Sequence, residues 1–344
     1  MKILKIPQKK IKKILIIKND KIGDMVLSTN IFRELRKNFA RAEITVIASN
    51  VNKELIEKNK NINEIIVLDY PTKINVNLLK AIFDYFKLSR NIRKQNYDLG
   101  VDLRGSIFNS LILLTLGKVR YRIGFYNRLL SKFFLDYAYK KDRKNKHVTF
   151  QRIDLINKAL GINAKNSWPD IQTDEKDSKK VQMIIKKYKL NNFVCIFPVA
   201  SFEKKQLSLE KFDFLIKYIY KKYGKYKIVL MGSEQDRSKI NCLLKKNKFC
   251  ILITNLNLRE LYLLLKKSSL VIAHDGGAMH LAWTAKTNLI ALMLGSLPVN
   301  YLKPLNKNSR TIISRKENMN SITLEKIEKE IDFFLKKSGR KDER

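Results

Sequence analysis

The sequence predicts an α/β protein of two similar halves, each a parallel sheet of strands covered by helices. Short apolar runs alternate with segments whose apolar residues recur at helical spacing, which is typical of βαβ units. A polar stretch over 163–177, which contains Pro169 and lacks apolar periodicity, separates the halves. The 344 residues are enough for two domains with well-buried cores, and we expect these domains to face each other across a cleft.

In the first half, Ile14–Ile17 is a continuous apolar run, as expected for a central parallel strand covered on both faces. The other strands are expected at 43–48, 65–68, 99–102 and 121–125, and helices at 26–38, 53–59, 78–95, 106–116 and 150–160. Gly161 then occupies a helix C-cap position.

The second half repeats this alternation. Strands are expected at 194–197, 227–231, 250–254, 270–273 and 289–293, and helices at 209–223, 237–246, 258–266 and 322–336. The basic tail 336–344 is expected to be frayed. We therefore expect one domain over 1–170, a second over 178–320, and a C-terminal helix and basic tail over 321–344.

An informative turn follows the first strand, where the loop contains Gly23 and Asp24. In open parallel sheets, ligands bind in the crevice at the carboxyl ends of the strands. A carboxylate at this place is positioned to act as a general base. The alternative is that Asp24 only caps the helix that follows.

A second turn, Asp275-Gly276-Gly277, joins the strand expected at 270–273 to a helix that carries His280. The first turn of a helix has backbone N–H groups without intrahelical partners, and its dipole favours an anion. The glycines lack Cβ and permit close approach of a ligand, while Asp275 lies where an N-cap belongs. A plain strand-to-helix turn is the alternative.

Two further loops of the second half carry candidate groups. The segment 197–208 places Lys204 and Lys205 after a strand, where an ammonium group can neutralise charge on a phosphate. The turn at 231–236 offers Glu234 and Asp236, and an acid at a strand end can bind ribose hydroxyls. A solvated surface lysine and a helix cap are the respective alternatives.

Composition limits the class of partner. The formal net charge of +38 predicts partners with negative charge, although a genome rich in lysine codons is an alternative source of it. The three scattered cysteines indicate a reducing compartment, and with three histidines they form no convincing metal site. Apolar runs are too short for a signal peptide or a transmembrane helix, so we expect a cytoplasmic protein, soluble or peripheral on the inner face of the membrane.

Several segments resemble the heptosyltransferases, glycosyltransferase family 9. In the first half these are KIGDMVLSTNIFRELRKNFARAEITVIA, YDLGVDLRG and YRIGF. In the second half they are FPVASFEKKQLSLEKF, VLMGSEQD and the Asp-Gly-Gly-x-x-His turn. The pieces are individually short, but they occur in the family's order through most of the chain.

The resemblance implies a GT-B fold and an inverting, metal-independent glycosyl transfer, with an acceptor-binding first domain and a nucleotide-sugar-binding second domain. Asp24 matches the catalytic base, and Lys205 matches the lysine that contacts the donor phosphate. The donor is expected to be ADP-heptose, bound as a substrate, and no cofactor is expected. The other residues implied for the donor are Ala200, Glu234, Asp275, Gly276, Gly277 and His280.

The resemblance also implies a phosphorylated, lipid-linked glycan as acceptor, from the lipopolysaccharide core or another surface glycan. Gly23, Arg104, Arg120 and Arg122 are the candidate acceptor-binding residues. The positive charge would then hold the protein at an anionic membrane surface. The chain contains no Asp-x-Asp sequence, so cations and the dipole of the helix after Gly277 are expected to stabilise the diphosphate.

Three departures from the family's pattern concern the donor. Val199 replaces a usual glycine, Leu207 a usual aromatic residue, and Asn30 a frequent proline. They leave the donor sugar open. Another GT-B enzyme, such as a sugar-nucleotide epimerase, and a basic nucleic-acid-binding protein remain alternatives, although the basic motifs of common nucleic-acid modules are missing from the sequence and no nucleic-acid partner is expected.

Overall fold

The computed structural model describes residues 10–70, 78–127 and 129–339. The chain divides into an N-terminal unit, Met1–Gln172, and a C-terminal unit, Thr173–Arg344. The division falls within the polar stretch 163–177. Part of the basic tail lies outside the described residues.

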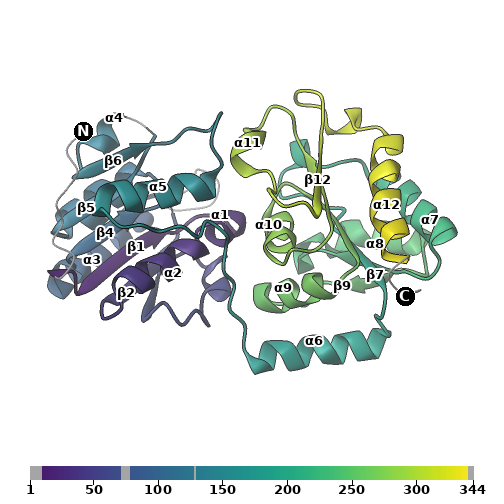
Figure 1. Cartoon of the computed structure of the whole chain (residues 1–344), viewed down its shortest axis with the longest axis horizontal. Helices are drawn as coiled ribbons and strands as arrows, with labels where there is room; N and C mark the ends of the chain where they lie inside the picture. The colour runs from purple at the N-terminus through teal and green to yellow at the C-terminus, as the bar shows by residue number, and fades with distance from the viewer. Residues whose placement is uncertain (1–9, 71–77, 128, 340–344) are drawn as a thin grey trace. The chain divides into compact units, whose positions relative to one another are not determined.

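The N-terminal unit contains a six-stranded, wholly parallel sheet in the order β3-β2-β1-β4-β5-β6 (Figure 1). Its strands are β1 (Lys13–Lys18), β2 (Glu43–Ala48), β3 (Glu64–Val67), β4 (Leu99–Asp102), β5 (Tyr121–Tyr126) and β6 (Tyr137–Lys140). Burial of the central strands on both faces explains their continuous apolar sequences.

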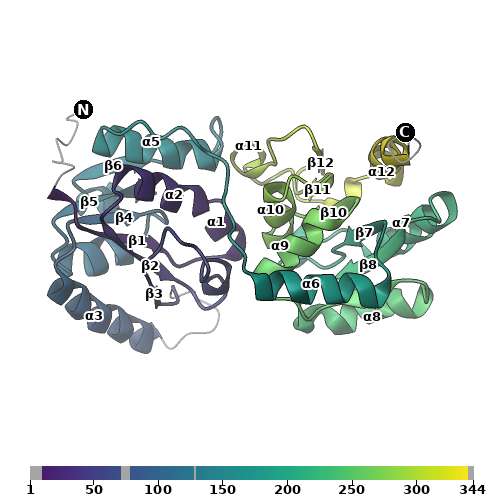
Figure 2. The same cartoon turned by 60° about the horizontal axis from the view of Figure 1, so that its bottom comes forward.

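Helices cover both faces of this sheet. Figure 2 shows α3 (Leu78–Gln95) on one face and α2 (Thr29–Asn38) and α5 (Val148–Leu160) on the other. The π-helix η3 (Phe108–Leu116) packs along α3. The remaining short elements are α1 (Ile22–Val26), the 3₁₀ turn η2 (Lys53–Leu55) and α4 (Leu129–Lys132).

The C-terminal unit has a second six-stranded parallel sheet, in the order β12-β11-β10-β7-β8-β9. Its strands are β7 (Phe193–Ile196), β8 (Lys227–Met231), β9 (Ile251–Ile253), β10 (Leu270–His274), β11 (Leu289–Met293) and β12 (Ser309–Ile313). Counted within its own unit, this order is the same as that of the first sheet. Both units are therefore Rossmann-like.

The helices of the C-terminal unit pack on this sheet around an apolar core. They are α6 (Glu175–Tyr188), α7 (Leu209–Lys222), α8 (Arg237–Lys246), α9 (Leu258–Lys267), α10 (Gly277–Thr284), α11 (Val299–Leu302) and α12 (Leu324–Gly339), with 3₁₀ turns η4 (Glu203–Lys205), η5 (Glu234–Asp236) and η6 (Met319–Ser321). Helix α12 contacts α7, β11 and β12 and so belongs to the C-terminal unit.

The structure confirms the parallel α/β architecture and the αL C-cap at Gly161, whose φ is 64°. The helix expected at 26–38 forms as α2 over Thr29–Asn38, so its start is three residues later than expected, and the separate short helix α1 ends at Val26. Ser28 Oγ donates to the Asp24 carbonyl at 2.8 Å, and Thr29 Oγ1 donates to the Val26 carbonyl at 2.8 Å. These side-chain hydrogen bonds accompany the end of α1.

Other segments also differ from the expectation. Only a 3₁₀ turn forms within 53–59, and a π-helix forms within 106–116. Helix α6 begins inside the stretch expected to be irregular, because Asp174 and Asp177 form a capping box there. The short elements α4, β6, α11 and β12 were not expected; they carry too few apolar residues to show a period.

Candidate functional site

The point where strand order reverses in the N-terminal sheet lies between β1 and β4. The loops after these two strands lead in opposite directions and leave room for a ligand at the carboxyl edge. Asp24 lies in the first turn of α1, just after β1, and its side chain is 40% exposed. The N-cap of α1 is Lys21, so Asp24 lies inside the first turn and not at the N-cap position. Its carboxylate is accessible to a substrate.

Two buried cations hold the Asp24 carboxylate. Lys18 Nζ lies 3.4 Å from Asp24 Oδ1 and 2.6 Å from Asp20 Oδ2. Arg152 NH2, from α5, lies 3.7 Å from the same Asp24 oxygen. Both cationic side chains are only 1% exposed. A carboxylate between two desolvated positive charges is favoured in its ionised form, which is the form that accepts a proton.

Two more cations lie at this edge, Arg104 in the loop after β4 and Lys141 directly after β6. Asp102 accepts hydrogen bonds from the backbone N–H groups of Arg104 and Gly105, at 2.9 and 3.1 Å, and so fixes the loop. The Arg104 guanidinium stacks on Tyr70, 3.4 Å from the ring centroid. Lys141 Nζ donates to the Arg104 carbonyl at 2.5 Å. Burial raises the pKa of Asp102 and lowers the pKa of Lys141 to about 7.

We call Lys18, Arg104, Lys141 and Arg152 the basic cluster. Asp20 lies within it, 3.7 Å from Arg104 NH1, and burial raises the pKa of Asp20. The cluster presents positive charge on the same edge of the sheet as Asp24. Such a site suits an anionic substrate with a hydroxyl group.

The structure does not bring Arg120 and Arg122 to this place. Arg120 precedes β5 and Arg122 is its second residue, so both lie at the amino edge of the sheet, opposite the edge of Asp24. Arg122 makes a two-point ion pair with Asp136, at 2.8 and 3.1 Å. The grouping of these two arginines with Arg104 is therefore wrong. Gly23 is buried in α1 beside Asp24.

In the C-terminal unit, strand order reverses between β7 and β10, and the residues after both strands meet. Lys205, in η4 after β7, places its Nζ 2.5 Å from Oδ2 of Asp275, which follows β10. The Asp275 side chain is 4% exposed and that of Lys205 21%. His280 Nε2 lies 3.8 Å from Asp275 Oδ1. Asp275 therefore orients the ammonium group of Lys205, which remains partly accessible.

Helix α10 begins at this ion pair. It starts at Gly277, and Gly276 is its N-cap, so the expectation that Asp275 is the N-cap is wrong. The φ of Gly276 is 176°, an extended conformation open to any residue. A Cβ built at Gly276 would meet only the His274 carbonyl oxygen, at 3.9 Å. Internal packing leaves room in front of the N-terminal amide groups of α10, where an anion is favoured.

The loop that carries Lys205 is tied to the core of its unit. His274 Nε2 accepts a hydrogen bond from the Leu207 N–H at 2.9 Å, and burial lowers the pKa of His274 to about 4. Leu207 is buried, and the Val199 side chain packs against the same core. The Ala200 N–H donates to Gln206 Oε1 at 3.4 Å. The departures at 199 and 207 thus place apolar side chains on the core.

Glu234 lies after β8, in η5, and its side chain is 63% exposed. It forms an ion pair with Arg237 and accepts a hydrogen bond from Thr254 Oγ1 at 2.7 Å. These partners lower the pKa of Glu234. Asp236 instead caps its own turn through the Ser233 N–H at 2.9 Å. Of the two acids, Glu234 is thus the more accessible at the carboxyl edge.

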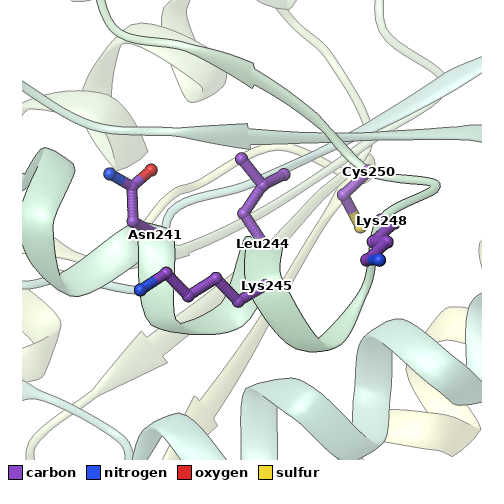
Figure 3. Close-up of a pocket in the computed structure, with 5 residues that line it drawn as sticks. All are labelled: Asn241, Leu244, Lys245, Lys248 and Cys250. Carbon is purple, nitrogen blue, oxygen red and sulfur yellow. The ribbon is translucent and has the colours of Figure 1, made fainter.

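The C-terminal unit also has a surface hollow that does not lie at the edge of the sheet with Lys205 and Asp275. Figure 3 shows its lining, which is Asn241, Leu244, Lys245, Lys248 and Cys250. These residues lie at the end of α8 and the start of β9, at the amino edge of the sheet. The hollow is therefore separate from the edge that carries Lys205 and Asp275.

Within the described ranges, no group of three or more His, Cys, Asp or Glu side chains is arranged to hold a metal ion. The same ranges contain no helix with the length and apolarity needed to cross a bilayer. The cysteines are free thiols.

Sequence reasoning missed Lys18, Lys141 and Arg152. Lys18 directly follows an apolar run, and a lysine at the end of a strand is too common to identify a site residue. Arg152 lies within the helical period of α5, and its contact with Asp24 joins residues far apart in the chain. A charged residue at a core position of an amphipathic helix is the signal that would have found it.

Comparisons with known proteins agree with this geometry. The sequence profile of glycosyltransferase family 9 (heptosyltransferase) matches residues 85–332. The chain is 24% identical over 314 residues to lipopolysaccharide heptosyltransferase 2 of Salmonella typhimurium, and the match covers 87% of each chain.

Solved structures of this family share the fold. A glycosyl transferase family 9 structure from Veillonella parvula has a TM-score of 0.81 at 20% identity, covering 95% of this chain and 98% of the other. The ADP-heptose lipopolysaccharide heptosyltransferase II of E. coli has a TM-score of 0.76 at 21% identity, covering 95% and 99%. An E. coli heptosyltransferase structure with ADP has a TM-score of 0.72 at 14% identity, covering 93% and 99%.

The UDP-GlcNAc 2-epimerase of Methanocaldococcus jannaschii is less similar, with a TM-score of 0.57 at 15% identity over 94% of this chain and 92% of the other. The fold is thus the GT-B fold of two Rossmann-like domains, and the heptosyltransferase structures match it better than the epimerase does. Because the family profile spans most of the chain, the protein belongs to glycosyltransferase family 9, the heptosyltransferase family, and is a glycosyltransferase.

Proposed function

We propose that this glycosyltransferase moves a heptose from ADP-heptose to a hydroxyl group of a lipopolysaccharide core precursor, with inversion at the anomeric carbon. The observation that carries the proposal is the accessible Asp24 carboxylate, held by Lys18 and Arg152 at the strand-order reversal of its sheet. The names of the relatives, and the solved heptosyltransferase with ADP, support the choice of sugar and nucleotide.

In the proposed reaction, Asp24 takes the proton of the acceptor hydroxyl as its oxygen bonds to the anomeric carbon. The bond between that carbon and the diphosphate oxygen breaks, and ADP leaves with the electron pair. Lys205 and the amide groups at the start of α10 neutralise the charge that develops on the diphosphate. Asp275 orients Lys205, and Glu234 is the candidate partner of the ribose hydroxyls.

We propose that these groups suffice without a divalent cation or another cofactor. The support is the presence of a cation and a helix N-terminus at the same edge of the C-terminal sheet. Transfer that is unchanged in the presence of EDTA is the expected result, and a requirement for added Mg²⁺ would contradict it.

We propose a lipid-linked, phosphorylated acceptor at the inner face of the cell membrane, with the protein cytoplasmic and peripheral. The basic cluster supports an anionic acceptor, with Gly23 and Arg104 beside it. The net charge of +38 supports attraction to anionic lipids. No nucleic acid is needed as a partner to explain this charge.

The test compares glycolipids of a deletion strain by mass spectrometry. The strain is expected to lack one heptose, and a plasmid carrying the wild-type gene restores it while Asp24→Asn does not. An unchanged glycolipid in the deletion strain would contradict the proposal. Conversion of ADP-heptose to another sugar nucleotide by the purified protein, without acceptor, would instead indicate an epimerase.

A further inference from the structure

Helix α3 carries a stripe of large apolar side chains on its exposed face. Leu79, Phe83 and Phe86 are 79%, 63% and 41% exposed. Their spacing of four and three residues places them on one side of the helix. The opposite side is buried against the unit through residues such as Tyr85 and Ile92. The stripe is therefore additional to the apolar surface that the fold itself needs.

Positive charge surrounds this stripe. The exposed cations of α3 are Lys80, Lys87, Arg90, Arg93 and Lys94. Asp84 is the only acid in the sequence of the helix, and it is partly buried. A helix face with apolar side chains flanked by lysine and arginine is complementary to a layer that has an apolar interior and anionic groups at its surface. An anionic lipid bilayer has this composition.

The same face of the sheet carries more exposed apolar side chains. η3 packs along α3, and Thr115 Oγ1 at its end donates to the Phe134 carbonyl at 3.4 Å. Leu116 and Phe133, each adjacent to one of these two residues, are 45% and 80% exposed. Exposed apolar side chains therefore also occur at the end of η3 and just after α4.

Helix α3 also contacts the loop that begins the candidate site. Asn19 Nδ2 donates to the Tyr85 hydroxyl at 2.7 Å, and Asn19 directly follows Lys18. Arg104 NH1 in turn lies 3.4 Å from the Asn19 carbonyl. Tyr85 lies between Phe83 and Phe86 in sequence. The buried side of α3, opposite the stripe, therefore contacts the loop after Lys18, which in turn contacts Arg104.

We propose that the exposed face of α3 docks on an anionic lipid bilayer, with Leu79, Phe83 and Phe86 inserted among the lipids and the flanking cations at the headgroups. The biological purpose of this docking rests on the proposed function, since a lipid-linked acceptor would then meet the protein at the edge that carries Asp24. The docking itself is a separate physical property of α3.

The test measures co-sedimentation of the full chain with vesicles of phosphatidylglycerol and phosphatidylethanolamine, and with vesicles of phosphatidylcholine alone. The test variant is Phe83→Asn with Phe86→Asn, which leaves the net charge unchanged. The wild type binds the anionic vesicles preferentially, and the variant loses roughly tenfold or more of its partition coefficient at physiological salt. The matched control is Phe214→Asn in α7, a 47% exposed aromatic between Lys211 and Lys217, which keeps wild-type binding.

Equal binding of the Phe83/Phe86 variant and the wild type would overturn the proposal, since charge alone would then explain the binding. A dimer in ultracentrifugation that the variant loses, without vesicle binding by the wild type, would assign the stripe to a second copy of the chain and also overturn it. Circular dichroism establishes that the variants are folded. Asp24→Asn binds vesicles as the wild type does, so failure of docking and failure of the proposed function remain distinguishable.

Discussion

The two sheets share one strand order but differ in the charge at their strand-order reversals. In the N-terminal unit, this edge carries the basic cluster, whose Lys18 and Arg152 are almost completely buried around Asp24. In the C-terminal unit, the same place carries one compact ion pair, Lys205 with Asp275, and the start of α10. The same topology therefore presents two different electrostatic environments.

This difference teaches how one fold can be used for two tasks. Under the proposed function, the buried positive charge in the N-terminal unit would favour the ionised carboxylate of Asp24 and attract an anionic acceptor. In the C-terminal unit, Lys205 pairs with Asp275 beside the N-terminus of α10, and under the proposed function its ammonium group and the helix amide groups together attract the diphosphate. Base chemistry is thus expected from the first unit and leaving-group stabilisation from the second.

The largest expected effect comes from the base. Asp24→Asn removes proton acceptance while it preserves side-chain size, and kcat is expected to fall about 1,000-fold. Turnover is measured as ADP release in the presence of acceptor. Asp136→Asn is the matched control, because Asp136 pairs with Arg122 at the amino edge of the same sheet, and it leaves kcat unchanged. A wild-type kcat in Asp24→Asn would show that Asp24 is not the catalytic base.

The next effect concerns the leaving group. Lys205→Met removes the ammonium group beside α10, and kcat/KM for the donor is expected to fall roughly 10- to 100-fold. Its neighbour Lys204 is 79% exposed and 3.6 Å from Glu317, so Lys204→Met serves as the control and retains full activity. An equal loss of kcat/KM in both variants would show that Lys205 acts only as one of the surface charges and has no specific contact with the donor.

A smaller effect concerns the pH profile. Arg152→Gln removes one of the positive charges beside the Asp24 carboxylate, so the acidic limb of kcat/KM is expected to move to higher pH. Arg152→Lys restores most of the wild-type profile because it keeps the charge. A lower rate with the same pH profile in Arg152→Gln would mean that Arg152 only supports packing.

The smallest effect concerns stability. Burial lowers the pKa of Lys141 to about 7 from its usual 10.5, so the unfolded chain binds this proton between these pH values and the folded chain does not. The resulting cost to stability grows as pH falls from 10.5 to 7 and is fully present below 7. Lys141→Met is expected to raise the unfolding free energy by about 1–3 kcal/mol at pH 6, and by almost nothing above pH 10.5.

Urea unfolding at pH 6 and at pH 9 measures this difference. An equal gain in the unfolding free energy of Lys141→Met at both pH values, or a loss at pH 6, would show that burial of the charged Lys141 does not lower the stability of the wild type. If Lys141→Met is more stable at pH 6 and also binds the acceptor more weakly, the basic cluster lowers the stability of the fold while it contributes to acceptor binding.

Sequence patterns predicted the parallel sheets because buried strands need continuous apolar runs. They also predicted the turns at Asp24 and at Gly276, because glycine and carboxylates there follow strand ends. They did not predict the partners of Asp24, since Arg152 reaches it only through the packing of α5. The break after Val26 was missed because it is accompanied by local side-chain hydrogen bonds of Ser28 and Thr29. The N-cap at Gly276 was missed because α10 begins without a side-chain cap, one residue later than a carboxylate cap at Asp275 predicts.

The most direct test of the division between base and donor-binding units is calorimetric titration of ADP into Asp24→Asn and into Lys205→Met. Asp24→Asn is expected to bind ADP with wild-type affinity although it does not turn over, while Lys205→Met binds ADP at least several-fold more weakly. Weakened ADP binding in Asp24→Asn, with wild-type binding in Lys205→Met, would contradict the assignment of the donor to the C-terminal unit.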